Sequence, residues 1–168
     1  MINLKTTREL RYMRDAGKIS QEALLKAGEA VRPGVSTLEL DKIVRRTIEK
    51  AGAVPSFLGY GGFPASACIS VNNVVIHGIP SAHEILKEGD IVSIDVGAIY
   101  EGFNGDNAWT FPCGKVSEEA QKLMDATRES LFLAIEKAVP GNRIGDIGSA
   151  VQQLSLIHIS EPTRPISI

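Results

Sequence analysis

The chain has 168 residues, 43% of them hydrophobic and 23% charged, and a formal net charge of -2. This composition predicts one globular domain and excludes a disordered, collagenous or coiled-coil chain. No apolar run approaches the roughly 20 residues of a membrane-spanning helix, and the near-neutral charge gives no signature of nucleic-acid binding. The two cysteines are too few for a disulfide framework, and the N-terminus has no apolar signal core, so we expect a cytoplasmic protein.

Two helices are predicted in the first third of the chain. Apolar residues recur at helical spacing over residues 7–30, and Arg32-Pro33-Gly34 ends that pattern. Ser36-Thr37-Leu38-Glu39 has the sequence of a capping box and predicts a second helix that ends near Gly52. Residues 55–64 are rich in glycine and aromatic residues and predict a loop.

Strands are predicted in the middle of the chain. Residues 67–71 and 74–77 are rich in Cys, Ile and Val and predict two strands, with a turn or bulge at Asn72-Asn73. Residues 91–100 and 103–111 predict a β-hairpin, because Glu101-Gly102 between them has turn chemistry.

Two further helices are predicted, and together with the first two they form an internal repeat. Ser117 is predicted to cap a helix that runs to about residue 138, and after Pro140-Gly141 another helix begins near Ile144. Each long helix thus ends near a Pro-Gly pair and is followed by a second helix, which suggests a duplicated fold. The alternative is that Pro-Gly is simply a common helix terminator.

The last residues do not continue this pattern. Residues 154–168 have no clean period and are predicted to interrupt the helix under way at residues 151–153. They resemble a translated adapter of the kind used in DNA sequencing libraries. We therefore interpret them as a non-native tail and expect His158 to be no ligand; a genuine divergent C-terminus is the alternative.

Asp95 is an acid within a strand, where burial without a partner costs several kcal/mol. If Tyr100-Glu101 forms the hairpin loop, Asp95 lies opposite Asp106. If Glu101-Gly102 forms it, Asp95 lies opposite Ala108. Both registers place the two carboxylates on one face of the sheet, because strand side chains alternate, whereas a three-residue loop would separate them.

Such a pair of carboxylates is compatible with a metal site. Like charges that face each other destabilise a sheet, and a bound divalent cation removes the repulsion. The alternative is that Asp106 is a surface acid in a loop formed by residues 104–107.

Three other features have both an ordinary and a functional interpretation. His77 is either a structural or solvated residue, or a proton donor beside a metal-bound substrate. Cys68 fits a core or pocket-lining position better than a nucleophile. The aromatic residues at 57–63 either pack locally or form an apolar side-chain pocket.

Several motifs together resemble one enzyme family. They are Val54-Pro55-Ser56-Phe57-Leu58-Gly59-Tyr60, Phe63-Pro64-Ala65-Ser66, Val71-Asn72-Asn73-Val74-Val75-Ile76-His77-Gly78-Ile79-Pro80, Gly89-Asp90-Ile91-Val92-Ser93-Ile94-Asp95-Val96, Gly102-Phe103-Asn104-Gly105-Asp106 and Trp109-Thr110-Phe111. The chain up to about Gln153 resembles the N-terminal half of a type I methionine aminopeptidase of the short bacterial form.

The resemblance implies a fold, a domain organisation and an activity. The fold would be the first half of an α+β pita-bread (creatinase/aminopeptidase) fold, a curved antiparallel sheet covered by helices. Residues 1–153 would be the N-terminal part of a single metallopeptidase domain. The activity would be metal-dependent removal of the initiator methionine from nascent proteins, by hydrolysis with a metal-bridging hydroxide. The cofactors would be two divalent ions (Co, Mn, Fe, Zn or Ni), and the partners nascent peptides with an N-terminal methionine and the ribosome.

The resemblance also implies roles for individual residues. Asp95 and Asp106 match the first two metal ligands, and His77 matches the catalytic, substrate-binding histidine. The positions that line the methionine pocket are matched by Phe57, Tyr60, Phe63 and Cys68. Small departures from the family pattern are Gly61 and Asn104, where many members have histidine, and Asn73, where many have glutamate.

The larger departure is that the remaining family ligands, a histidine in a Gly-His-Gly segment and two glutamates, have no counterpart here. We therefore expect the fragment alone to be inactive. The alternatives are a prolidase-type pita-bread peptidase, which the loop at residues 57–63 disfavours, and a non-catalytic pita-bread binding protein. The latter is disfavoured because Asp95, Asp106 and His77 are all present.

Overall fold

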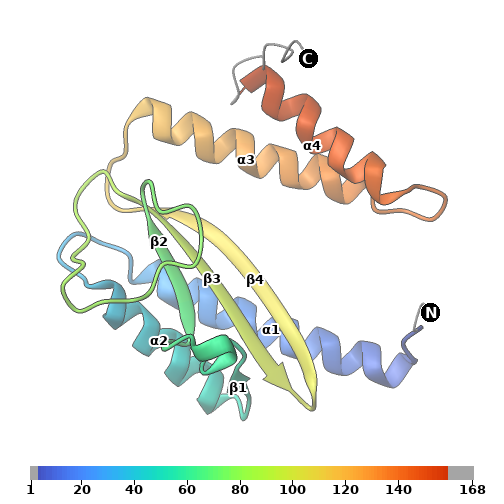
Figure 1. The fold of residues 1–168 in the computed structure, drawn as a ribbon, viewed down its shortest axis with the longest axis horizontal. Helices are drawn as coiled ribbons and strands as arrows, with labels where there is room; N and C mark the ends of the chain where they lie inside the picture. The colour runs from blue at the N-terminus through green and yellow to red at the C-terminus, as the bar shows by residue number, and fades with distance from the viewer. Residues whose placement is uncertain (1–3, 159–168) are drawn as a thin grey trace. The chain divides into compact units, whose positions relative to one another are not determined.

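The computed structural model describes residues 4–158, and the chain divides after Val116 into two compact units. The first unit contains helices α1 and α2, strands β1 to β4 and a short 3-10 helix, η1, and the second contains helices α3 and α4 (Figure 1). The bounds in chain order are α1 Thr7–Glu29, α2 Thr37–Lys50, β1 Val54–Pro55, η1 Tyr60–Gly62, β2 Ala67–Val71, β3 Ile91–Tyr100, β4 Phe103–Pro112, α3 Glu118–Lys137 and α4 Ile144–His158.

Capping boxes begin both helices of the first unit. The Ser36 hydroxyl accepts the backbone N–H of Glu39 at 3.3 Å, and the Glu39 carboxylate accepts the N–H of Ser36 at 2.8 Å. Thr6 and Glu9 form the same pair of bonds at the start of α1. The box at Ser36 was predicted, and it supplies partners for backbone donors that a helix start otherwise leaves free.

Strand β3 is the centre of an antiparallel sheet. It pairs with β4 along its whole length, and on its other edge it pairs with β2 and then with the short strand β1. Tyr100 faces Phe103, so Glu101 and Gly102 form the two-residue turn of the predicted hairpin. Their φ angles of 50° and 80° are those of a type I′ turn, the twist of which suits an antiparallel hairpin.

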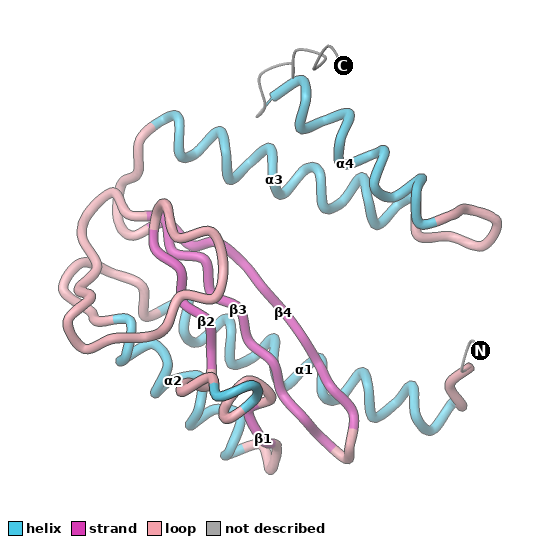
Figure 2. The backbone as a smooth tube through the Cα atoms, viewed as in Figure 1, coloured by secondary structure: helices cyan, strands magenta, loops and turns pink. Residues whose placement is uncertain are grey.

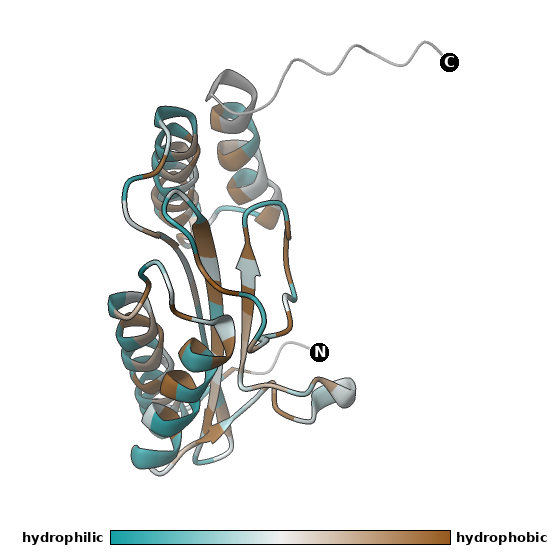
Figure 3. Cartoon of the chain, turned by 90° about the vertical axis from the view of Figure 1, so that its left-hand side faces the viewer, coloured by the Kyte–Doolittle hydropathy of each residue, from teal (hydrophilic) through white to brown (hydrophobic). Residues whose placement is uncertain are grey.

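Helices α1 and α2 cover one face of this sheet, and Figure 3 shows both on the same side of the strands. Apolar side chains from the two helices meet the alternate residues of β3 that point towards them, and the buried core contains Leu24, Leu40, Val44, Ile48, Ile69, Val92, Ile94 and Val96. Asn107 of β4 also bonds to α1, donating to the carbonyl of Gly17 at 3.0 Å and the hydroxyl of Ser20 at 2.7 Å. The opposite face of the sheet is therefore the one that the two helices leave free.

The predicted strand at residues 74–77 is wrong. This segment belongs to the long loop between β2 and β3 (Figure 2), and Val75 is 85% exposed. The segment returns to β2 only at Gly78, the carbonyl of which accepts the N–H of Ile69 at 2.9 Å. Positive φ angles at Asn72 (53°) and His77 (58°) bend the chain away from a ladder, so β-branched composition alone does not produce a strand here.

The second unit confirms two predicted helices and corrects a third expectation. The hydroxyl of Ser117 accepts the N–H of Ala120 at 3.1 Å and caps α3, and α4 begins at Ile144 as predicted. The predicted interruption after Gln153 is wrong, because α4 continues to His158 and Leu154 is buried. No glycine or proline occurs between Gln153 and His158, so the local sequence does not interrupt the helix.

The non-native origin of residues 154–168 and the duplicated fold stay predictions, and residues 159–168 lie outside the described part of the chain. Within residues 4–158, no helix has both the length and the apolar character needed to cross a membrane.

Candidate active site

The two predicted metal ligands lie on the face of the sheet that α1 and α2 leave free. Asp95 of β3 faces Ala108 of β4, and Gly97 faces Asp106. The carboxylates are therefore diagonal neighbours on one face, as the Glu101-Gly102 turn requires. Residues 104–107 lie within β4, so the alternative that they form a loop is wrong, but Asp106 is exposed, as that alternative expected.

The surroundings of Asp95 raise the pKa of its carboxyl group. Burial raises the pKa of Asp95 to about 6, with further contributions from the negative charge of Asp106 and a hydrogen bond with its side chain. The charge of His77 and the backbone N–H of Val96 act in the opposite direction. Burial and the charge of Asp106 therefore disfavour the charged form of Asp95, and a divalent cation would remove this penalty.

Cys68 lies directly beside Asp95 on the neighbouring strand β2. Its side chain is 6% exposed, and burial followed by the charges of Asp95 and Asp106 raises the pKa of the thiol to about 11. The thiol is therefore protonated at neutral pH. A protonated, buried thiol is a soft apolar surface rather than a nucleophile, as its sequence position predicted.

His77 is held at the edge of β2 by the residue that follows it. The N–H of Gly78 donates to the hydroxyl of Ser70 at 3.1 Å, and the carbonyl of Gly78 accepts the N–H of Ile69. Because the charge of His77 lowers the pKa of Asp95, the imidazole lies within electrostatic reach of the carboxylate pair. His77 is exposed, so its side chain is free to reach a substrate.

Phe57 lies against the strand that carries Asp95. The N–H of Ser56 donates to the carbonyl of Gly97 at 3.0 Å, which leads the chain onto the site face. The ring of Phe57 lies against Gly97, where a Cβ atom would be 2.7 Å from ring atom Cε1. Gly97 was not predicted as part of the site, although a glycine in a strand interior is a signal of such close approach.

The other two aromatic residues belong to a loop that closes on itself. Tyr60 accepts the N–H of Phe63 at 2.9 Å through its carbonyl, and Phe63 accepts the N–H of Gly59 at 2.8 Å. Tyr60 is 81% exposed and Phe63 is partly buried. The structure thus places Cys68 beside Asp95 and Phe57 against Gly97, while the pocket roles of all four residues stay predictions.

The described residues provide only part of a metal site. Among the side chains that the structure describes, those of residues 4–154, no three His, Cys, Asp or Glu group closely enough to hold an ion. Asp95 and Asp106 nevertheless fit the role of ligands, because carboxylate oxygens suit hard and borderline divalent cations and the pair carries an unfavourable like charge. Two carboxylates leave most of a coordination shell unfilled.

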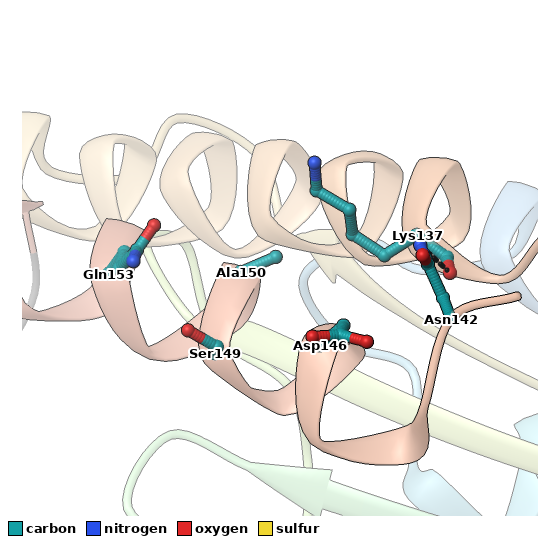
Figure 4. Close-up of a pocket in the computed structure, with 6 residues that line it drawn as sticks. All are labelled: Lys137, Asn142, Asp146, Ser149, Ala150 and Gln153. Carbon is teal, nitrogen blue, oxygen red and sulfur yellow. Dashed lines mark hydrogen bonds between the residues drawn. The ribbon is translucent and has the colours of Figure 1, made fainter.

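A hollow in the second unit is lined by none of the predicted site residues. It is lined by polar side chains of α3, α4 and their connection (Figure 4), namely Lys137, Asn142, Asp146, Ser149 and Gln153, together with Ala150. The carboxylate of Asp146 already accepts the N–H of Arg143 at 2.7 Å, and the side chain of Asn142 donates to the carbonyl of Lys137 at 2.9 Å. These polar groups form hydrogen bonds at the helix ends, so we assign no binding site to this hollow.

Comparison with known proteins identifies proteins that are similar to this chain in sequence and in structure. Methionine aminopeptidase of Clostridium acetobutylicum is 54% identical over 153 residues, which are 91% of this chain and 61% of the relative. The crystal structure of methionine aminopeptidase from Rickettsia prowazekii matches with a TM-score of 0.91 at 39% identity, covering 94% of this chain and 63% of that one. Prolidase from Pyrococcus furiosus matches with a TM-score of 0.81 at 25% identity, covering 90% and 43%.

These matches confirm the predicted resemblance and the predicted α+β fold with its antiparallel sheet. The chain spans a little less than two thirds of the length of the methionine aminopeptidases that it matches. Residues 11–156 match the sequence profile of metallopeptidase family M24. The chain therefore belongs to metallopeptidase family M24.

Proposed function

We propose that the protein to which these residues belong is a metal-dependent aminopeptidase that removes the N-terminal methionine of nascent proteins. The observation that carries the proposal is the pair of carboxylates, Asp95 and Asp106, on a sheet face beside the apolar surfaces of Phe57 and Cys68. The 54% identity to a methionine aminopeptidase supports the same activity. Nascent chains imply the ribosome as a partner and the cytoplasm as the location.

Asp95 and Asp106 would hold a divalent metal, and we propose that the complete site contains two such ions, drawn from Co, Mn, Fe, Zn and Ni. When bound, the metal would polarise the scissile carbonyl and lower the pKa of a water molecule. Membership in a metallopeptidase family supports the need for a divalent cation. Two carboxylates leave most of a coordination shell unfilled, so we expect residues 1–168 alone to bind metal weakly and to lack activity.

The other residues would position the substrate. His77 would donate a hydrogen bond to the oxygen that becomes negative during attack on the carbonyl. Phe57 and Cys68 would contact the methionine side chain, which is unbranched and polarisable and so suits an aromatic and sulfur-lined surface. Tyr60 and Phe63, from the loop after Phe57, would complete this pocket.

The test uses a chimera in which residues 1–153 are joined to the remaining part of the Clostridium acetobutylicum relative. With added manganese or cobalt, we expect the chimera to release methionine from a Met-Ala-Ser peptide, and EDTA to abolish the release. The matched variant Asp106→Asn removes one ligand without changing side-chain size, and we expect it to lower kcat/KM at least about 100-fold.

Other outcomes would separate the alternatives. A folded chimera that releases no methionine contradicts the proposal. Hydrolysis of X-Pro peptides instead would indicate a prolidase-type enzyme, for which the lower identity to the prolidase gives less support. Tight ribosome or RNA binding with no hydrolysis of either peptide would indicate a non-catalytic binding protein.

A further inference from the structure

Gly97 occupies a distinctive position on the candidate site face. It follows Asp95 by two residues on β3 and lies directly opposite Asp106 on β4. A side chain at this position would therefore stand beside both carboxylates. Gly97 is nevertheless buried, although it has no side chain of its own. Another part of the chain must cover it.

The covering groups come from the two residues that follow β1. A Cβ atom at Gly97 would lie 2.0 Å from the hydroxyl oxygen of Ser56, and 2.7 Å and 3.2 Å from atoms Cε1 and Cζ of Phe57. The φ angle of Gly97 lies outside the left-handed region, so any L-residue could adopt its backbone conformation. Space, rather than backbone conformation, excludes a side chain here.

The start of the covering segment is fixed to the sheet. Val54 and Pro55 pair with Ile99 and Ala98, and the N–H of Ser56 continues this pairing by donating to the carbonyl of Gly97. The Ser56 hydroxyl can turn away from an added methyl group by one rotation about its Cα–Cβ bond. The ring of Phe57 is larger and already partly buried against the sheet, so it would have to move off Gly97.

We propose that Gly97 is a specificity-determining residue, an inference that rests on the proposed aminopeptidase function. The absence of a side chain at position 97 lets the Phe57 ring lie against the sheet next to Asp95 and Asp106. The ring then forms an apolar surface on the same face of the sheet as the two carboxylates, where it would contact the methionine side chain. A side chain at position 97 moves this surface and weakens the recognition of methionine.

The first arm of the test uses residues 1–168 as they stand. Nuclear Overhauser contacts between the Phe57 ring protons and the Hα protons of Gly97 should be present in the wild-type chain and lost in Gly97→Ala. The matched control is Gly17→Ala on α1, where an added Cβ meets nothing within 4 Å. Far-UV circular dichroism of each variant shows whether it is folded.

The second arm measures kcat and KM of the chimera described above on Met-Ala-Ser and Leu-Ala-Ser peptides. We expect Gly97→Ala to raise KM for the methionyl peptide about tenfold, with kcat changed less than about twofold, and to narrow the preference for methionine over leucine. Phe57→Leu, which introduces no clash, should act in the same way. If Gly97 acts through Phe57, the double variant should be no worse than either single variant.

Each remaining outcome decides the matter. Three results would each overturn the inference. The first is the absence of the Phe57–Gly97 contacts in the wild-type chain, and the second is a KM for Gly97→Ala equal to that of Gly17→Ala. The third is additive effects on KM in the double variant. An inactive wild-type chimera would overturn the proposed function and this assignment together. If the wild-type chimera is active but the KM of its Gly97→Ala variant is unchanged, only the role assigned to Gly97 is overturned.

Discussion

The sharpest prediction concerns the replacement Asp95→Asn in residues 1–168 without added metal. Asparagine keeps the shape of the side chain but removes the charge that burial and Asp106 disfavour. We therefore expect the variant to be more stable than the wild-type chain at neutral pH. A residue whose removal stabilises the fold is typical of a site kept for function rather than for stability.

The size of this stability difference and its pH dependence follow from the pKa of Asp95. In the folded chain the pKa of Asp95 rises from 3.8 to about 6, which at 1.36 kcal/mol per pH unit corresponds to about 3 kcal/mol for ionising the folded form. Asp95 is only about half buried, so solvent screens part of this, and we expect about 1–2 kcal/mol. Below about pH 3 the carboxyl is largely protonated in both folded and unfolded chains and the penalty vanishes. Between about pH 4 and 6 the unfolded chain ionises first, so wild-type stability falls relative to the variant.

The measurement is urea unfolding of both proteins at several pH values, followed by the fluorescence of Trp109, the single tryptophan, which faces Ile94 across the hairpin. The difference in unfolding free energy should be near zero at about pH 3 and reach its full value above about pH 7. Asp125→Asn, an exposed residue of α3, is the control and should show no such rise. Manganese should narrow the difference by stabilising only the wild-type chain. A variant that is less stable at pH 7, or a difference independent of pH, would refute the reasoning.

Two further predictions concern groups around the start of β2. Asp41 is 7% exposed and accepts the N–H groups of Ser66 at 2.7 Å and Ala67 at 2.9 Å. Its replacement by alanine leaves buried donors unpaired and should lower the unfolding free energy by about 2–4 kcal/mol in urea titrations, against a smaller loss for asparagine; a loss below about 0.5 kcal/mol would contradict this role. Burial and the neighbouring carboxylates raise the pKa of Cys68 to about 11, so iodoacetamide should modify it slowly at neutral pH, as followed by peptide mass mapping. Asp95→Asn removes one of those charges and should accelerate the modification of Cys68, and an unchanged rate would show that burial alone controls it.

Local sequence features determined much of the secondary structure. The capping box at Ser36, the cap at Ser117 and the turn at Glu101-Gly102 each lie where the sequence predicted them. These signals are reliable because each depends on contacts within a few residues of the chain. The alternation of strand side chains likewise predicted that Asp95 and Asp106 share a face.

The register and the surroundings of the site were decided by tertiary structure. Two hairpin loops were compatible with the sequence, and only the Glu101-Gly102 turn places Asp95 opposite Ala108. Residues 74–77 have strand composition but form no ladder, because pairing depends on a partner edge and not on propensity. The ring of Phe57 against Gly97 joins residues 40 positions apart. No local pattern encodes such a contact, because it exists only once β1 has paired with β3 and carried the loop onto the sheet.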